Sequence, residues 1–168
     1  MISTVLSEGV LMDITLMQPG QERPAIDLVK AVFDRFVAPE FSQQGIAEFY
    51  KYANEDSLSR RTGVDHFTIL ALERHRILGI LEIKDFCHVS MFFVRSNHQK
   101  KGIGRELLKD AVRRIQKKRN DLSELTVNAS PNAVAAYAKF GFTSKSGEQC
   151  TNGIRFVPMV LKTDYERV

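Results

Sequence analysis

The most restrictive feature of the sequence is a glycine-rich turn between an apolar segment and an amphipathic one. The apolar segment runs from Val89 to Val94, and the turn consists of Gln99, Lys100, Lys101, Gly102, Ile103, Gly104 and Arg105. A glycine turn at the start of a helix directs backbone N–H groups and the positive end of the helix dipole toward one point. The pattern therefore predicts a strand, a turn that binds an anion such as phosphate, and a helix, in that order.

Two familiar phosphate-binding loops do not fit this turn. A Walker loop needs a second glycine followed by Lys and Ser or Thr, and no such run occurs here. A dinucleotide fingerprint needs a third glycine, where this chain has Leu107. Both kinds of nucleotide site are disfavoured.

The turn instead resembles the Gln/Arg-x-x-Gly-x-Gly/Ala signature of the GCN5-related N-acetyltransferases, in which this loop binds the pyrophosphate of acetyl-coenzyme A. A second segment, Leu125 to Phe142, resembles that family's strand, helix and closing Tyr-x-Lys-x-Gly-Phe. Order and spacing agree across Val89 to Phe142, and the sequence is identified as a member of the family.

Length and composition predict a single domain over residues 1–168, with residues 1–11 as a loosely ordered N-terminal extension. The chain has 168 residues, of which 43% are hydrophobic and 26% are charged, as in a soluble globular protein. No apolar run approaches the roughly 20 residues that span a bilayer, and the first residues do not resemble a secretion signal. We therefore expect no membrane association and a cytoplasmic location.

The net charge of +4 does not predict a nucleic-acid partner, because Lys and Arg are spread along the chain. The densest basic cluster lies at residues 113–119, in the second half of the helix after the turn. Cations there form a solvated face near a helix C-terminus. A modest positive charge also suits a polyanionic cofactor.

Hydrophobic periodicity predicts an α/β (α+β) fold, with a mixed, mostly antiparallel sheet of six to seven strands flanked by about four helices. The expected strands lie at residues 12–17, 66–73, 77–84, 87–94, 124–129, 143–150 and 154–161. The expected helices lie at residues 26–36, 46–53 and 103–115, and between Ser130-Pro131 and Gly141. Residues 54–63 are polar and are expected to form a loop.

The family resemblance implies that the fourth and fifth strands splay apart and that the pantetheine arm lies between them. The backbone contacts to that arm would come from Phe92, Phe93 and Val94. Relatives place an asparagine at the start of the last helix, where this chain has Ser130. Ser130, Asn128 or Asn132 would supply that contact, and Ser130 as a plain N-cap is an equally good interpretation.

An amine acceptor needs help to lose a proton, because an alkyl ammonium with a pKa near 10.4 pays about 4 to 5 kcal/mol to become neutral at pH 7. His88 and Glu82 are the candidate bases, with water as an alternative. His88 occupies the place where histone-acetylating relatives have their basic glutamate, and Glu82 interrupts an apolar run. A three-residue loop would put Glu82, His88 and Ser90 on one sheet face, whereas a two-residue loop would separate Glu82 from His88. Alternatively, either residue has no catalytic role and only forms local hydrogen bonds on a half-exposed strand.

Tyr137 holds the position of the family tyrosine that faces the cofactor sulfur. We expect it to hydrogen-bond the departing thiolate and to donate a proton as charge builds. The alternative is a core tyrosine whose hydroxyl bonds a backbone carbonyl. No metal site is expected, because His66, His75 and His98 lack ligand spacing, and Cys87 and Cys150 are expected to be inert.

These observations predict an acetyl-coenzyme A-dependent N-acetyltransferase that acts on a primary amine by direct attack in a ternary complex. The acceptor, a small molecule or a peptide or protein amine, stays open, and so does a homodimer. Two alternatives remain: a non-catalytic acyl-coenzyme A sensor on the same fold, and a basic nucleic-acid adaptor.

Overall fold

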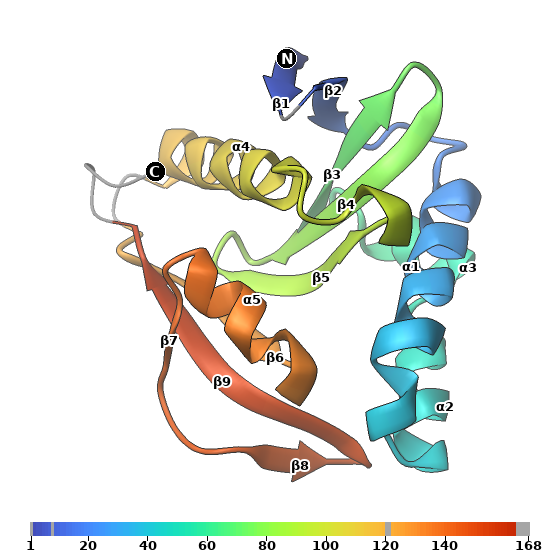
Figure 1. The fold of residues 1–168 in the computed structure, drawn as a ribbon, viewed down its shortest axis with the longest axis vertical. Coiled ribbons are helices and arrows are strands. Elements are labelled where there is room, and N and C mark those ends of the chain that lie inside the picture. Colours follow the sequence, from blue (N-terminus) through green and yellow to red (C-terminus); the bar gives the residue numbers. More distant parts are fainter. Residues whose placement is uncertain (1, 8, 120–121, 164–168) are drawn as a thin grey trace.

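The computed structural model describes residues 2–7, 9–119 and 122–163 (Figure 1). Within these ranges the chain forms one sheet with the strand order β1-β2-β3-β4-β5-β6-β9-β7, and β8 pairs with β9. The strands are β1 (Ser3–Ser7), β2 (Val10–Leu16), β3 (His66–Glu73), β4 (Arg76–Lys84), β5 (His88–Val94), β6 (Glu124–Ala129), β7 (Thr143–Ser144), β8 (Gln149–Thr151) and β9 (Ile154–Lys162). The α-helices are α1 (Glu22–Phe36), α2 (Gln43–Tyr52), α3 (Glu55–Arg61), α4 (Ile103–Lys118) and α5 (Val134–Lys139). Three short 3₁₀ turns are η1 (Ala38–Glu40), η2 (Ser96–His98) and η3 (Pro131–Ala133).

The predicted mixed, mostly antiparallel sheet is confirmed, since β5 and β6 are the one parallel pair among the described strands. The described residues form nine strands and five α-helices rather than six to seven strands and about four helices. Residues 143–150 form two short strands, β7 and β8, instead of one. Two further differences lie in segments for which no element was expected.

The N-terminal extension is the first of these segments. Residues 3–7 form β1, an edge strand that pairs with β2 from Ser3 opposite Ile14 to Ser7 opposite Val10. Val5 packs against the main core, so residues 3–7 belong to the sheet by burial as well as by backbone pairing. Met1 lies outside the described residues.

Residues 55–61 form α3, where the polar composition predicted a loop. The Asn54 side chain caps the helix by accepting a hydrogen bond from the Ser57 N–H at 2.9 Å. Leu58 is fully buried, while acidic residues occupy the first turn and arginines the last. One buried residue is too few to produce helical periodicity in the sequence, but it anchors about two turns of capped helix.

The core has two parts, one on each face of the sheet. On one face α4 packs Ile103, Leu107 and Ala111 against strands β2 to β6 and β9. On the other face α1 packs Ile26 and Val29, together with residues of α3, against β3 to β5. β4 lies between both parts, and its seven inner residues are all buried. Six of these are apolar or glycine, and Glu82 is the exception.

Candidate active site

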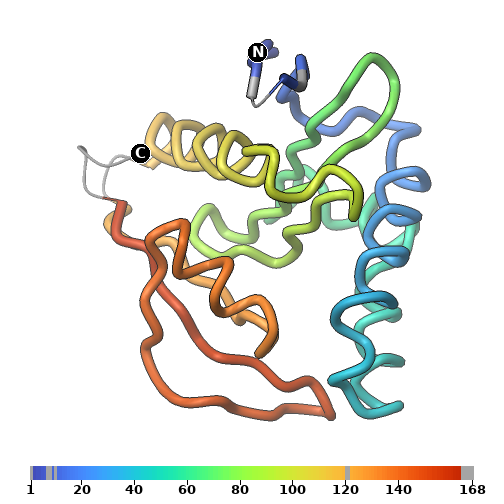
Figure 2. The backbone as a smooth tube through the Cα atoms, viewed as in Figure 1, coloured from blue at the N-terminus to red at the C-terminus, as the bar shows by residue number. Residues whose placement is uncertain are grey.

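The parallel contact between β5 and β6 is short. His88 lies opposite Thr126 and Val89 opposite Val127, and no further pairs follow. Beyond Val89 the two strands diverge, and the traces of β5 and of β6 with β9 separate in Figure 2. The predicted splay is therefore present, and it leaves the second half of β5 without a neighbour on that side.

Backbone groups of β5 that face this gap can be assigned from the pleat. The Arg95 N–H donates to Leu78 O of β4 at 2.8 Å, so Arg95 and Phe93 direct their backbone groups toward β4. Phe92 and Val94 alternate with them and face away from β4. The Gln99 side chain confirms this direction, since its Nε2 donates to Val94 O at 3.1 Å. Of the three residues expected to bind the pantetheine arm, Phe92 and Val94 direct backbone groups away from β4, whereas Phe93 directs its backbone groups to β4 and its ring to Phe49 of α2.

The glycine turn follows directly and leads into α4 as expected. Gly102 is the residue before the helix and has φ +76°, a left-handed conformation that glycine adopts without strain, and Lys100 has φ +60°. No side chain caps this helix, so the N–H groups of its first turn have no side-chain acceptor. Gly104 allows close packing, because a Cβ there would lie 3.0 Å from Phe140 Cζ and 3.3 Å from Phe92 Cζ. The residues present fit a phosphate group at this point.

Tyr137 lies on α5 against the start of the gap. Its ring packs at 6.0 Å from Phe92 and edge-on at 5.3 Å from Phe142, and the residue is 9% exposed. Burial raises the pKa of its hydroxyl well above the usual value, so the phenol stays protonated. No hydrogen bond from this hydroxyl to another described residue is present, unlike the core tyrosine considered above. A protonated donor therefore stands beside β5 without a protein acceptor.

The segment before α5 differs from a simple helix start. Ser130 precedes the 3₁₀ turn η3 but makes no capping hydrogen bond; its Oγ donates to Asn132 Oδ1 at 2.7 Å. Asn132 Nδ2 in turn donates to Phe36 O at the end of α1. The plain N-cap interpretation of Ser130 is therefore wrong. Asn128 is exposed on β6, opposite Pro158 of β9. Gly141 ends α5 with φ +96°, as predicted.

His88 lies where β5 and β6 still pair, and its contact with Thr126 bears on which ring nitrogen carries the proton. Thr126 Oγ1 directs its single hydrogen to Cys87 O at 3.2 Å. With its hydrogen directed there, Thr126 Oγ1 can accept a hydrogen bond from His88 Nδ1, which lies 2.8 Å away. This arrangement favours the tautomer with the proton on Nδ1 and a lone pair on Nε2. Burial, and secondarily the charge of Lys84, lower the pKa of His88, which favours this neutral form at pH 7.

Glu82 is held in a buried ion pair. It is 0% exposed, and its Oε1 accepts from Arg61 Nε at 2.6 Å. Its Oε2 accepts from Arg61 Nη2 at 3.2 Å and from the Tyr52 hydroxyl at 2.9 Å. The Arg61 guanidinium stacks over the Tyr52 ring at 3.8 Å. This pairing explains why a charge is tolerated within the apolar run of β4.

The loop between β4 and β5 has the three residues 85–87, because Lys84 lies opposite His88. Glu82 and His88 therefore share the face of the sheet covered by α1 to α3. A bulge between Glu82 and Ile83 shifts the register, so that Met91 lies opposite Glu82 and Ser90 is the extra residue. Ser90 hydrogen-bonds Tyr52 on this same face. The loop therefore has the length that was expected to place Glu82, His88 and Ser90 on one face of the sheet.

Tyr52 and Arg61 were not found by sequence reasoning. Arg61 lies in the segment expected to be a loop, and its partner is 21 residues away on β4. The last-turn arginines of a capped short helix were the available local signal, but they do not identify the partner.

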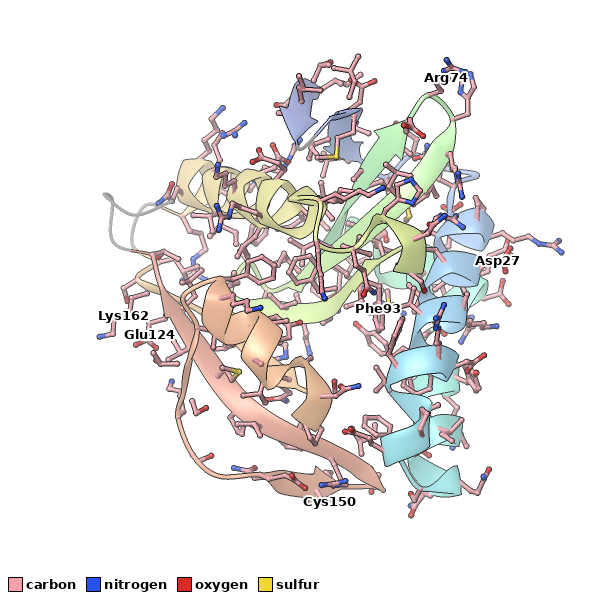
Figure 3. All side chains as sticks on the ribbon, in the orientation of Figure 1. Asp27, Arg74, Phe93, Glu124, Cys150 and Lys162 are labelled. Carbon is pink, nitrogen blue, oxygen red and sulfur yellow. The ribbon has the colours of Figure 1, made fainter. Side chains whose placement is uncertain are left out.

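An aromatic cluster forms the wall beside the gap on the α1 and α2 side. The Phe33 and Phe49 rings stack at 3.8 Å, and Phe49 contacts Phe93 of β5 edge-on at 6.0 Å. Figure 3 labels Phe93, which extends from β5 toward α1. The wall reaches the far side of the gap at the N-terminus of α2, where Ser42 Oγ lies 3.3 Å from Gly153 O in the turn between β8 and β9. A Cβ at Gly45 would lie 2.2 Å from the same oxygen, so only glycine allows this approach.

Two further features bear on function. The described residues contain no group of three or more His, Cys, Asp or Glu side chains that could hold a metal ion. Within the same ranges no helix is long and apolar enough to cross a membrane.

Comparison with known proteins places the chain in a family. Residues 37–163 match the family model described as acetyltransferase (GNAT) domain. Comparison with curated proteins gave no match.

Similar solved structures agree in fold. A GCN5-related N-acetyltransferase from Rhodopseudomonas palustris has a TM-score of 0.75 at 22% identity, covering 96% of this chain and 98% of that chain. PaiA N-acetyltransferase from Thermoplasma acidophilum, solved in complex with coenzyme A, has a TM-score of 0.73 at 19% identity, covering 90% and 98%. The ribosomal-protein-S18-alanine N-acetyltransferase from Escherichia coli has a TM-score of 0.62 at 16% identity, covering 90% and 94%.

Proposed function

Because the chain belongs to the GNAT acetyltransferase family and is an acyltransferase, we propose that it moves an acetyl group from acetyl-coenzyme A to a primary amine. The amine attacks directly within a ternary complex. The observation that carries this proposal is the divergence of β5 from β6 beyond Val89, immediately before an uncapped glycine turn. The gap suits an extended thioester-bearing arm, and the turn suits its pyrophosphate.

The donor is held by backbone groups and by mobile cations. The N–H groups at the start of α4 bind the pyrophosphate, and Lys100, Lys101 and Arg105 add positive charge around it. Phe92 hydrogen-bonds the pantetheine arm through its backbone N–H and C=O, as an added strand would, whereas Val94 O already accepts from Gln99 Nε2. Acetyl-coenzyme A supplies an activated acyl group as its thioester. The Val94 N–H polarises that carbonyl, and this stabilises the oxygen charge that develops during attack.

Tyr137 stabilises the leaving thiolate by a hydrogen bond, and because burial raises the pKa of its hydroxyl far above that of a thiol, the thiolate takes its proton from water rather than from Tyr137. Its hydroxyl has no protein acceptor among the described residues and stays protonated because burial raises its pKa. A developing thiolate is a stronger acceptor than a neutral thioester sulfur, so this hydrogen bond strengthens in the transition state. Ser130, Asn128 and Asn132 have a smaller part, since Asn132 and Ser130 already bond each other.

His88 takes up the proton of the attacking amine through a chain of waters, because it lies at the opposite end of β5 from Val94, roughly 20 Å along the strand. Its free Nε2 lone pair and its lowered pKa keep it in the accepting form at pH 7. Glu82 is the weaker candidate, because each of its oxygens already accepts from Arg61 and protonation would leave that cation unpaired. Glu82 then holds Arg61 and Tyr52 in place behind the acceptor wall.

The proposal is tested by incubating the enzyme with acetyl-coenzyme A and a panel of amines, with release of free thiol as the readout. The panel contains polyamines, aminoglycosides, amino acids and peptides with free N-termini or lysines. Tyr137→Phe is the matched variant, because it keeps the ring between Phe92 and Phe142 and removes only the donor. We expect turnover to fall about 10-fold to 100-fold while coenzyme A binding stays intact.

Two results would count against this function. Silence of the wild type across the whole panel, with tight binding of acetyl-coenzyme A, would favour a non-catalytic sensor. Unchanged turnover in Tyr137→Phe would remove Tyr137 from the mechanism while leaving the transferase reaction in place.

A further inference from the structure

A basic hollow lies outside the residues assigned to the acetyl donor. Three arginines from separate elements line it: Arg35 in the last turn of α1, Arg76 at the start of β4, and Arg95 after β5. Ser96 and Asn97 of η2 add polar groups beside them. The hollow has a volume of about 490 Å³, within the range of about 300 to 1,000 Å³ that small-molecule sites occupy.

The three arginines keep their charges available. Among the described residues none of them forms an ion pair, whereas Arg61 and Arg155 pair with glutamates elsewhere. Arg95 donates through Nε to Ile77 O at 3.1 Å, and Arg35 lies over the Phe36 ring at 5.1 Å. These contacts fix the stems of two guanidinium groups and leave their remaining N–H donors unbonded to protein acids.

In the part of the chain that the structure describes, no acidic side chain lines the hollow. Glu73 lies opposite Arg76 in the strand register without pairing with it. The pKa of the neighbouring His98 is lowered by burial and then by Lys101, Arg76 and Arg95, against an opposing effect of Glu73. One side of the hollow is apolar, because α1 lines it with Leu28, Ala31 and Val32.

We propose that this hollow is a second anion site, which binds a small organic polyanion carrying phosphate or carboxylate groups. Guanidinium forks match both groups with paired hydrogen bonds, and three unpaired forks suit more than one negative charge. The apolar wall of α1 accommodates the carbon skeleton of such a molecule. Inorganic phosphate alone would use the arginines and leave that wall uncovered.

The site is distinct in its residues from the proposed donor site. None of its lining residues belongs to the turn at residues 99–105 or to α5. Arg95, Ser96 and Asn97 nevertheless precede that turn directly in the chain, so the phosphates of coenzyme A are an alternative source of the same chemistry. An experiment must separate an independent anion from the coenzyme's own phosphates.

The experiment titrates pyrophosphate, and separately citrate, into the protein by calorimetry, with and without saturating coenzyme A. The test variant is the double substitution Arg35→Gln with Arg76→Gln. The matched control is Arg23→Gln with Arg74→Gln, which removes the same charge from the same helix and from the same hairpin between β3 and β4. Arg23 is exposed and Arg74 lies at the tip of the turn between β3 and β4 (Figure 3), and neither lines the hollow.

We expect at least one of the two anions to bind the wild type in the presence of coenzyme A. The test variant should weaken that binding about 10-fold or more, and the control by less than about 2-fold. Arg35 and Arg76 are exposed, so both double variants should melt close to the wild type. The single variants Arg35→Gln and Arg76→Gln give the same comparison if the double variant does not fold.

Three results would overturn the proposal. Complete loss of anion binding on adding coenzyme A would place the anion at the donor turn. Equal weakening in test and control variants would show attraction to net charge alone. Absence of binding by both anions to the wild type would show that the arginines hold no small anion. None of these results depends on acetyl transfer, so a failure here is distinguishable from a failure of the proposed reaction.

Discussion

Replacing Glu82 by glutamine separates a structural role from a catalytic one. The substitution keeps the shape of the side chain and an oxygen that can accept from Tyr52, but it removes the negative charge. Arg61 then loses its partner at a place where only 12% of its side chain is exposed. Breaking a buried ion pair from one side costs about 3 to 5 kcal/mol. Because the retained amide oxygen and the partial exposure of Arg61 recover some of this cost, we expect a loss of about 3 kcal/mol.

This loss has a measurable thermal consequence. For a domain of this size, about 1 kcal/mol corresponds to about 2 to 4 °C in melting temperature, so Glu82→Gln should melt about 6 to 12 °C lower. Urea unfolding should show the same loss as a lower midpoint with an unchanged slope. Glu124→Gln is the matched control, because its pair with Lys145 is 3.4 Å long and both side chains are substantially exposed. That change should cost less than about 1 kcal/mol.

Kinetics complete the test at a temperature where both variants are folded. Glu82→Gln should retain the acid limb of the pH–rate profile, because the proposed base, His88, is intact. The reasoning fails if Glu82→Gln melts within about 2 °C of the wild type. It also fails if turnover falls more than about 100-fold with unchanged stability, since that pattern belongs to a base.

Three further predictions concern His88, Gly102 and Gly45. Burial lowers the pKa of His88, so the neutral base should persist below pH 6.5 and the rate should fall only in more acidic buffer; His88→Gln should abolish that limb in a pH–rate profile. The same lowered pKa means that the unfolded state binds the proton first, so the stability contributed by neutral His88 is present above pH 6.5 and is lost as pH falls below it, as urea titrations at several pH values would show. Gly102→Ala should cost about 1 to 2 kcal/mol because φ is +76° there, and calorimetry should show weaker coenzyme A binding; unaltered affinity would contradict the role of the turn. Gly45→Ala would place a Cβ 2.2 Å from Gly153 O, and steady-state kinetics should show a raised KM for the amine with an unchanged KM for the donor.

Local sequence signals predicted the elements that carry their own periodicity or caps. α1 and α4 each bury a regular apolar stripe, and Ser42 caps α2 by accepting from the Gly45 N–H at 3.1 Å. The glycine turn was recognisable because its residues must adopt special backbone angles. These features depend on neighbours within a few positions.

The remaining features depend on residues far apart in the chain. The Glu82 pair with Arg61 spans 21 residues, and the Asn132 bond to Phe36 spans 96. The bulge in β5 arises from pairing with β4, which composition does not encode locally. The direction of each backbone edge in β5 follows from that register, so the separate roles of Phe93 and Val94 required the structure.

The short parallel contact between β5 and β6 has a mechanical consequence. Two strands that pair over only two residue pairs at one end could move apart at the other end if no contact held them there. Here the far side is tied twice, by Ser42 to Gly153 and by Asn132 to Phe36. These two hydrogen bonds therefore limit how far the two sides of the gap can move apart before any molecule enters it. In the proposed reaction, the donor arm would therefore enter this gap with little reorganisation of the protein.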